Sequence, residues 1–197
     1  LIGTQMIVKA HDFSRVTLVG VLLADLTLFS GDYRAGERTF DLLTQAAGRA
    51  GRGDVPGKVV IQTYKPDNYA ITAAASQDYR AFYDIEEAYR SLMRYPPEWN
   101  MMVIMGTGMD EEQLANIMDR MYSLIRGKYI NAGHLSVIGP SEPAISKIKD
   151  VYRRVLYIKH RDYRMLVDVK DYVEEWLKEN GESDVSVFFD MNPVNMY

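Results

Sequence analysis

Apolar runs and one amphipathic stretch organise the first third of the chain. Leu1–Met6 and Val16–Ala24 are largely continuous apolar runs, which predicts buried strands of a parallel sheet. Ala35–Gly48 carries apolar residues at helical spacing and predicts a helix, and Lys58–Tyr64 predicts a third strand. The order of strand, helix and strand predicts a parallel α/β layer.

Helical periodicity resumes after a break at Pro66. Tyr69–Ser76 and Asp78–Arg94 predict helices, and the prolines that follow Tyr95 end the second, because a residue before proline disfavours helical backbone. We therefore predict three parts, which are residues 1–66, a helical connector over residues 67–97, and a separate domain over residues 98–197.

The last part alternates in the order strand, helix, strand, strand, helix, strand, which is typical of a ferredoxin-like βαββαβ domain. The predicted strands are Met101–Met105, Leu135–Ile138, Arg154–Lys159 and Val185–Asp190, and the predicted helices are Asp110–Arg126 and Tyr163–Glu179. Residues 141–150 are predicted to be a polar loop.

The composition excludes several classes of site. The chain has no cysteine, so disulfides and thiolate metal sites are excluded. Its three histidines lie far apart in the sequence and lack metal-ligand spacing, so no metal site is predicted. No apolar run reaches the roughly 18 residues of a membrane span. We expect a cytoplasmic protein that does not contact a membrane.

The most informative chemistry lies in Gln45-Ala-Ala-Gly-Arg-Ala-Gly-Arg52. Arg49 and Arg52 lie three residues apart and share a helix face, while Gly48 and Gly51 let a large ligand approach the backbone. Two guanidinium groups on a bare backbone suit the γ-phosphate of a nucleotide. The alternative is a solvated arginine pair at a helix C-terminus, which the helix dipole favours.

A cationic stripe in the last part suggests a second kind of ligand. The net charge of the chain is −4, yet eight cations gather between residues 147 and 170, interleaved with Tyr152, Tyr157 and Tyr163. They are Lys147, Lys149, Arg153, Arg154, Lys159, Arg161, Arg164 and Lys170. Aromatics among cations suit single-stranded nucleic acid. A solvated strand edge and helix face, with tyrosines covering a core, is the alternative.

Two sets of residues resemble helicase motifs. Gly3-Thr4-Gln5-Met6, with Lys9 and Asp12, resembles motif V of superfamily-two helicases, and Gln45, Gly48, Arg49 and Arg52 resemble motif VI, Q-x-x-G-R-x-x-R. The sequence is similar to that of the PriA (primosomal protein N′) family of bacterial replication-restart DNA helicases in six segments, which are GTQM, K-x-HDF, VTLVGVL-x-AD, RA-x-ERTF, LLTQ-x-AGRAGRG and VIQTY. The resemblance is dense over residues 1–66 and weaker through residue 197.

The resemblance implies a fold and roles for individual residues. The implied fold is a parallel α/β half of a RecA-like helicase lobe, followed by a small α/β domain, which agrees with the ferredoxin-like C-terminal domain that periodicity predicts. Six residues are expected to act on the nucleotide. Arg52 would be the arginine finger, Arg49 would hold the γ-phosphate, and Gln45 would report the nucleotide state. Asp12 would contact the nucleotide side or couple it to motif V, and Gly48 and Gly51 would lie in the nucleotide-binding segment beside the arginines. Thr4 and Lys9 are expected to contact DNA phosphates. The cationic stripe separately predicts DNA contacts at Arg153, Lys159, Arg161 and Arg164, which are expected to meet at one end of their domain. Glu37 and Arg38 are expected to form a structural ion pair.

One departure from the family stands at motif V. The family usually reads Lys-Gly-His-Asp-Phe, and here Ala10 replaces the glycine. If this position needs a left-handed backbone, the motif is strained, since alanine adopts that conformation only at a cost. If it needs only a small residue, nothing changes.

Missing motifs predict that this chain is the C-terminal part of a longer helicase and is inactive alone. It lacks both a G-x-x-x-x-G-K-[ST] loop and the acidic pair that would hold magnesium, so ATP and Mg²⁺ are expected to bind mainly to another lobe. The family's zinc belongs to the parent protein and none is expected here. Expected partners are forked and single-stranded DNA, single-strand-binding protein and other primosome proteins. Two rivals are a motor lobe of an RNA or protein-remodelling ATPase, and a pure interaction or DNA-binding module.

Overall fold

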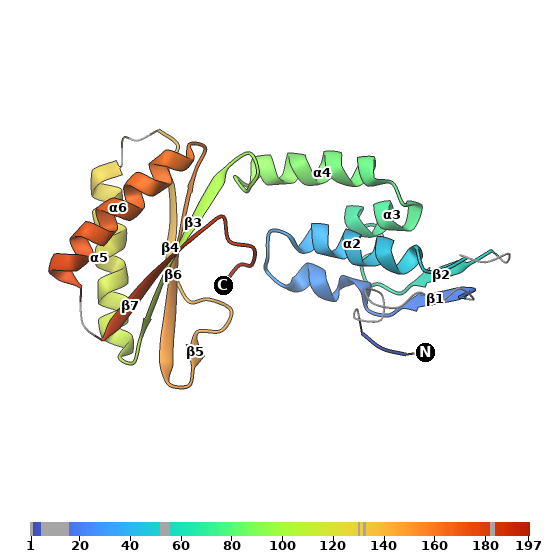
Figure 1. Cartoon of the computed structure of the whole chain (residues 1–197), viewed down its shortest axis with the longest axis horizontal. Coiled ribbons are helices and arrows are strands. Elements are labelled where there is room, and N and C mark those ends of the chain that lie inside the picture. The colour runs from blue at the N-terminus through green and yellow to red at the C-terminus, as the bar shows by residue number, and fades with distance from the viewer. Residues whose placement is uncertain (1, 5–15, 52–55, 130, 132, 182–183) are drawn as a thin grey trace. The chain divides into compact units, whose positions relative to one another are not determined.

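The computed structural model describes residues 2–4, 16–51, 56–129, 131, 133–181 and 184–197 of the chain. The chain divides into two compact units, Leu1–Tyr89 and Arg90–Tyr197, which are described separately (Figure 1). Both units combine helices with sheet, so the predicted α/β class is confirmed.

The first unit contains a parallel pair of short strands beside three helices. Strand β1 (Leu18–Val21) pairs in parallel with β2 (Lys58–Ile61), with Leu18 opposite Lys58. Between them lie a 3-10 helix, η1 (Ala24–Phe29), and helix α2 (Ala35–Ala47). Helices α3 (Tyr69–Ser76) and α4 (Tyr79–Leu92) follow, and the last residues of α4 belong to the second unit.

Helices α3 and α4 share a core with α2. Phe40 of α2 stacks on Phe82 of α4, with 4.3 Å between ring centroids, and Ala70 and Ala74 of α3 are fully buried against this pair. Most of the predicted connector is therefore part of the first unit, because α3 and Phe82 of α4 are buried in one core with α2, although Ile85 and Tyr89 of α4 are exposed. The boundary between units falls at Tyr89, not at residue 66 or 97.

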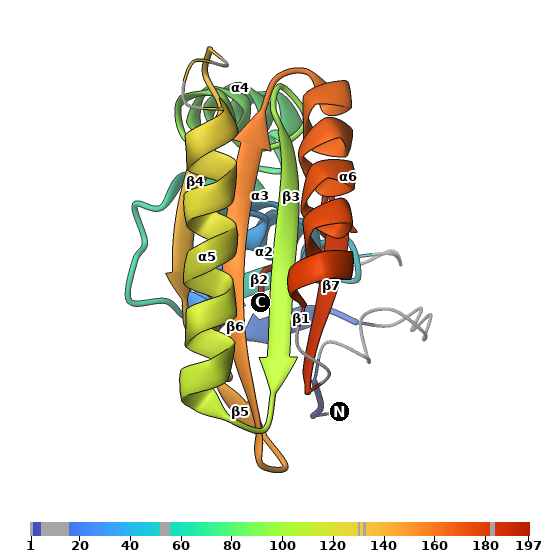
Figure 2. The same cartoon turned by 90° about the vertical axis from the view of Figure 1, so that its left-hand side faces the viewer.

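The second unit is a two-layer structure with one antiparallel sheet. Its strands are β3 (Asn100–Gly108), β4 (Ser136–Ser141), β5 (Lys147–Ile148), β6 (Val151–His160) and β7 (Val185–Met191). The order is β4-β6-β3-β7, with β5 paired to β6 as a hairpin. Helices α5 (Glu111–Tyr129) and α6 (Tyr163–Asn180) cover the same face of the sheet (Figure 2).

The helix-facing side of the sheet forms the larger core. Its centre is fully buried and includes Met102 and Ile104 of β3, Leu156 of β6, Met118 of α5 and Val169 of α6. Met101 and Val103 of β3 and Val155 of β6 point to the opposite face and are also fully buried, so both faces of these two strands are covered.

Several predicted elements differ in extent from the observed ones. Ile2–Thr4 are not in a strand, and the rest of the predicted strand Leu1–Met6 lies outside the described residues. The predicted strand Val16–Ala24 is shortened, because its end leads into η1. The predicted polar loop contains β5, which pairs with the start of β6. Among the described residues, no helix is long and apolar enough to cross a membrane.

Candidate functional site

The candidate site of the first unit is the turn that follows α2. We call residues 48–51 the arginine turn. Its backbone continues the helix, since Gly48 N–H donates to Thr44 (2.9 Å) and Arg49 N–H donates to Ala46 (3.1 Å). Gly51 then leaves the helical path with φ of +75°, a conformation that glycine adopts without a steric penalty. Its N–H donates to Val16 (2.9 Å), which fixes the turn to the chain just before β1.

A second glycine holds the arginine turn against β2. A Cβ added at Gly51 would lie 2.7 Å from the backbone nitrogen of Gly57, and one added at Gly57 would lie 2.5 Å from the carbonyl carbon of Ala50. Both contacts are with backbone, which cannot swing aside as a long side chain can. The close approach of Gly51 and Gly57 therefore sets the position of the turn.

The structure brings four of the predicted nucleotide-site residues together at one helix end. Gln45 and Gly48 are exposed there, Arg49 is half-buried, and Gly51 completes the turn. Of the residues predicted at motif V, Thr4 is exposed and not part of a helix or strand. Predictions at Lys9, Ala10, Asp12 and Arg52 lie outside the described residues.

A cavity of about 250 Å³ lies beside the arginine turn. Its lining comes from the end of α2, the turn, β2 and the end of α3, and consists of Ala47, Ala50, Gly57, Val59, Ile61, Ala75 and Gln77. This lining contains no cationic side chain.

Two acidic residues support the elements around the turn. Asp25 in η1 is buried and accepts a hydrogen bond from the Tyr64 N–H (3.1 Å), which joins η1 to the segment after β2. Arg38 of α2 pairs with Asp32 (2.9 Å), which lies just before that helix, so this ion pair ties the start of α2 to the preceding segment. The expected pairing of Glu37 with Arg38 stays a prediction.

The cationic stripe of the second unit does not form one surface. Arg153 lies opposite Thr107 near the start of β6, whereas Arg161 follows His160 at its other end. Eight residues of strand separate the two arginines by roughly 25 Å. The expectation that Arg153 meets Arg161 and Arg164 at one end of this unit is therefore wrong.

Much of the stripe is occupied within the protein. Lys147 pairs with Asp150 (3.2 Å) and Lys170 with Glu174 (2.8 Å). Arg153 donates to the carbonyl of Ile145 (3.1 Å). Of the three interleaved tyrosines, Tyr163 is exposed, while Tyr152 and Tyr157 are half-buried. Arg161 and Arg164 remain exposed, as a phosphate contact requires.

Lys159 is a buried structural residue rather than a surface cation. It is 5% exposed, its Nζ donates to the carbonyl of Met93 (3.1 Å), and the ammonium lies 3.5 Å from the centre of the Tyr95 ring. Burial, and secondarily the nearby charge of Arg94, lowers the pKa of Lys159 to about 8. This placement argues against the predicted DNA contact at Lys159.

Replacing Lys159 with methionine should change how stability depends on pH. The folded chain releases this proton near pH 8, whereas the unfolded chain holds it to about pH 10.5. Between these values the unfolded state binds more protons, so the wild type gains stability as pH rises, and below pH 8 the full cost of the buried charge is present. The Lys159→Met chain lacks this gain.

Urea unfolding followed by tryptophan fluorescence tests this expectation. Both tryptophans, Trp99 and Trp176, belong to the second unit, so their emission reports its unfolding. The difference in unfolding free energy between wild type and Lys159→Met should shift in favour of the wild type from pH 8 to pH 10. Parallel curves for the two chains would contradict the assignment.

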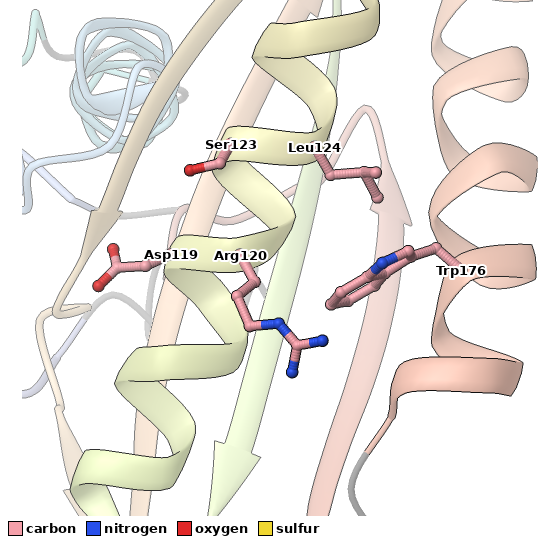
Figure 3. Close-up of a pocket in the computed structure, with 5 residues that line it drawn as sticks. All are labelled: Asp119, Arg120, Ser123, Leu124 and Trp176. Atoms are coloured by element: carbon pink, nitrogen blue, oxygen red, sulfur yellow. The ribbon is translucent and has the colours of Figure 1, made fainter.

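One hollow of the second unit lies between α5 and α6. It measures about 420 Å³ and is lined by Asp119, Arg120, Ser123, Leu124 and Trp176. Figure 3 shows the Arg120 side chain from α5 directed toward the Trp176 indole from α6, with 4.9 Å from the guanidinium carbon to the ring centre. Arg120 also donates to the Asn180 side chain (3.2 Å). These contacts join the two helices, and none of the predicted site residues lies here.

The described residues contain no group of three or more His, Asp and Glu that could hold a metal ion. Fold and candidate site together define a mixed α/β protein with an arginine-bearing helix end in one unit and an antiparallel sheet under two helices in the other. The family model described as the primosomal protein N C-terminal domain matches residues 91–194. The chain belongs to this PriA family, as its motifs predicted.

Relatives with the name replication restart protein PriA match along the whole chain. The Bacillus subtilis protein is 39% identical over 100% of this chain and 24% of its own length. The Chlamydia trachomatis protein is 36% identical over 100% of this chain and 26% of its own, and the Synechocystis protein is 33% identical over 100% and 23%. The chain thus spans about a quarter of the length of these relatives. The de novo designed protein Foldit4 covers 47% of this chain at 18% identity and a TM-score of 0.34, too weak a likeness to carry an argument.

Proposed function

We propose that this chain acts in replication restart as part of an ATP-dependent DNA helicase of the PriA family. The observation that carries the proposal is the Q-x-x-G-R-x-x-R sequence at the end of α2 in a chain that matches replication restart proteins throughout. The parallel β1–β2 pair beside α2 supports the assignment of the first unit to half of a RecA-like motor lobe. The strand order β4-β6-β3-β7 supports a ferredoxin-like assignment of the second unit.

In this proposal the arginine turn contacts the phosphate end of ATP. The exposed backbone at Gly48 and the exposed side chain of Gln45 suit an approaching nucleotide. Arg49 holds the γ-phosphate, and Arg52 neutralises the charge that develops on it in the transition state. Asp12 lies on the nucleotide side or couples it to motif V.

ATP and Mg²⁺ would be held mainly by another lobe of the full-length helicase. When bound, they supply the phosphoryl chemistry, and this chain supplies cationic groups and a backbone without side chains at the glycines. Zinc does not fit this chain, since cysteine is absent from its sequence and the described residues offer no metal-ligating cluster. We therefore assign zinc to the parent protein alone.

The remaining predicted residues would contact DNA. Thr4 and Lys9 contact strand phosphates through a hydroxyl, a backbone N–H or an ammonium group. In the second unit, the exposed Arg161 and Arg164 are the better placed of the predicted contacts, and Arg153 would act separately. Forked and single-stranded DNA, single-strand-binding protein and other primosome proteins are the proposed partners, and the cytoplasm, where bacterial forks lie, is the proposed location.

The purified chain should bind DNA and leave ATP unhydrolysed. Its phosphate-binding arginines have no nucleotide-binding loop opposite them, because the sequence contains no G-x-x-x-x-G-K-[ST] segment. Release of inorganic phosphate should stay at the background of a chain with Arg49→Ala and Arg52→Ala, with or without fork DNA. Hydrolysis that DNA stimulates and the double substitution removes would contradict this assignment.

The binding half of the experiment compares fork DNA, single-stranded DNA and RNA by fluorescence anisotropy at several salt concentrations. The proposal expects DNA binding that weakens as salt rises, because phosphate contacts release counterions. Equal or tighter binding of RNA would favour a motor lobe for RNA, and absence of nucleic-acid binding would favour an interaction module.

A further inference from the structure

Three cations of the second unit gather around two aromatic rings. The guanidinium carbon of Arg94 lies 5.0 Å from the centre of the Trp99 ring, and that of Arg161 lies 5.4 Å from the same point. The two carbons are thus no farther apart than the sum of these distances, about one Debye length at 0.1 M salt. The ammonium of Lys159 is the third cation, over the Tyr95 ring.

The backbone around the cluster fixes both arginines in place. Arg94 has φ of +58°, an uncommon conformation for a residue with a side chain, and it persists only when neighbours determine it. One such neighbour is Lys159, whose Nζ donates a hydrogen bond to the carbonyl of Met93 (3.1 Å), the residue before Arg94. The carbonyl of Arg161 accepts a bond from the side chain of Asn100 (2.8 Å), next to Trp99.

Among the described residues, no carboxylate is paired with either arginine. Neither Arg94 nor Arg161 forms an ion pair among the residues that the structure describes, and both side chains are exposed. The two acids nearest in sequence are used elsewhere. Glu98 accepts a bond from the Ser91 hydroxyl (3.2 Å), and Asp162 caps α6 through the Arg164 N–H (2.9 Å).

The lowered pKa of Lys159 also indicates that no carboxylate from the described part of the chain lies close to this group of cations. Its pKa is lowered by burial and by Arg94, whereas a carboxylate within reach would raise it. Two exposed guanidinium groups, with a third cation buried below them, therefore present a positive region that an anion from outside the protein would neutralise.

We propose that Arg94 and Arg161, held on Trp99, form a phosphate-binding site through which the second unit grips the backbone of a DNA strand. This inference rests on the proposed DNA-binding function. Phosphate is favoured because guanidinium groups bind its oxygens in pairs, and because a DNA strand offers consecutive anions to two neighbouring arginines. Trp99 itself is 5% exposed, so it acts as a platform for the arginines and not as a surface for a base.

The test compares the Arg94→Ala, Arg161→Ala double variant with a matched control in the full chain. The control is Arg120→Ala with Arg126→Ala, which also removes two exposed arginines stacked on aromatic rings of the second unit. Binding of a fluorescent oligo(dT) is measured by anisotropy at several salt concentrations. The site variant should bind roughly tenfold more weakly at low salt. Its salt slope should fall by about 0.7 for each phosphate lost, and the control should match the wild type.

Two further measurements guard against misfolding as the cause. The Arg94→Lys, Arg161→Lys variant keeps both charges and loses the paired donors, so its affinity should fall between those of the wild type and the alanine variant. In the wild type, bound oligo(dT) should raise the pKa of Lys159 from about 8, as followed by NMR of ¹³C-labelled lysine, because an adjacent anion favours the charged ammonium.

The possible outcomes separate the site from the function. If wild type binds DNA and the site variant binds as the control does, the site is wrong and the proposed function stands. If wild type binds no DNA at any salt, both fail. An acidic peptide serves as a competing ligand, and loss of its binding in the site variant, with DNA binding intact, would make the cluster a protein-docking site and overturn the proposal.

Discussion

Replacing Arg52 with alanine in a full-length helicase of this family should lower ATP turnover by roughly 10³–10⁵ while fork binding persists. The reason is that an arginine finger acts on charge that exists only in the transition state, so its loss removes rate without removing ground-state contacts to DNA. Arg49→Ala should differ, because a residue that holds the γ-phosphate also contributes to nucleotide affinity.

The measurement is steady-state ATPase activity with saturating fork DNA, together with fork affinity by anisotropy. A suitable control is Arg80→Ala, since Arg80 is an exposed cation of the same unit that pairs with Asp84, four residues along α4. Near-normal activity of the Arg52→Ala enzyme would show that Arg52 is not the finger. Equal loss of fork binding would indicate a DNA contact instead.

Replacing Gly57 with alanine should disable the arginine turn without removing either arginine. The new Cβ would meet the carbonyl carbon of Ala50 at 2.5 Å and the Ala50 Cβ at 2.7 Å, so the turn must shift. Crowding of this kind destabilises a structure by roughly 1–3 kcal/mol. We therefore expect a less stable first unit and a large loss of ATPase activity in the full-length helicase, because misplaced arginines cannot reach the phosphate.

Gly20→Ala is the matched control, since a Cβ at Gly20 in β1 would meet no atom within 4 Å. Hydrogen exchange in the 197-residue chain localises the effect. The Gly57→Ala variant should lose protection at the Gly51 and Lys58 amides, which donate to Val16 (2.9 Å) and Thr17 (2.8 Å). Tryptophan emission should stay unchanged, because both tryptophans lie in the second unit. Unchanged protection and activity would show that the turn tolerates the methyl group.

Local sequence pattern was sufficient for most helices and strands of this protein. Tyr69–Ser76 was predicted with its observed bounds, and the Asn68 side chain that caps this helix accepts the Ala70 N–H (2.9 Å). The strand, helix, strand, strand, helix, strand order of the second unit also followed from periodicity, because one buried face repeats every two residues in a strand and every three to four in a helix. The Q-x-x-G-R-x-x-R spacing, taken with stretches such as GTQM, K-x-HDF and RA-x-ERTF, was enough to identify the family.

Tertiary structure alone decided which residues share a surface. The length of β6 sets Arg153 and Arg161 at opposite ends of one strand, but pairing with β3 decided which residues lie beside each of them. The burial of Lys159 depends on Met93 and Tyr95, more than sixty residues earlier in the chain. Arg94 and Arg161, which both lie against Trp99, are likewise more than sixty residues apart in the sequence. These contacts depend on strand register and on how the chain returns across the sheet, which a local sequence pattern does not encode.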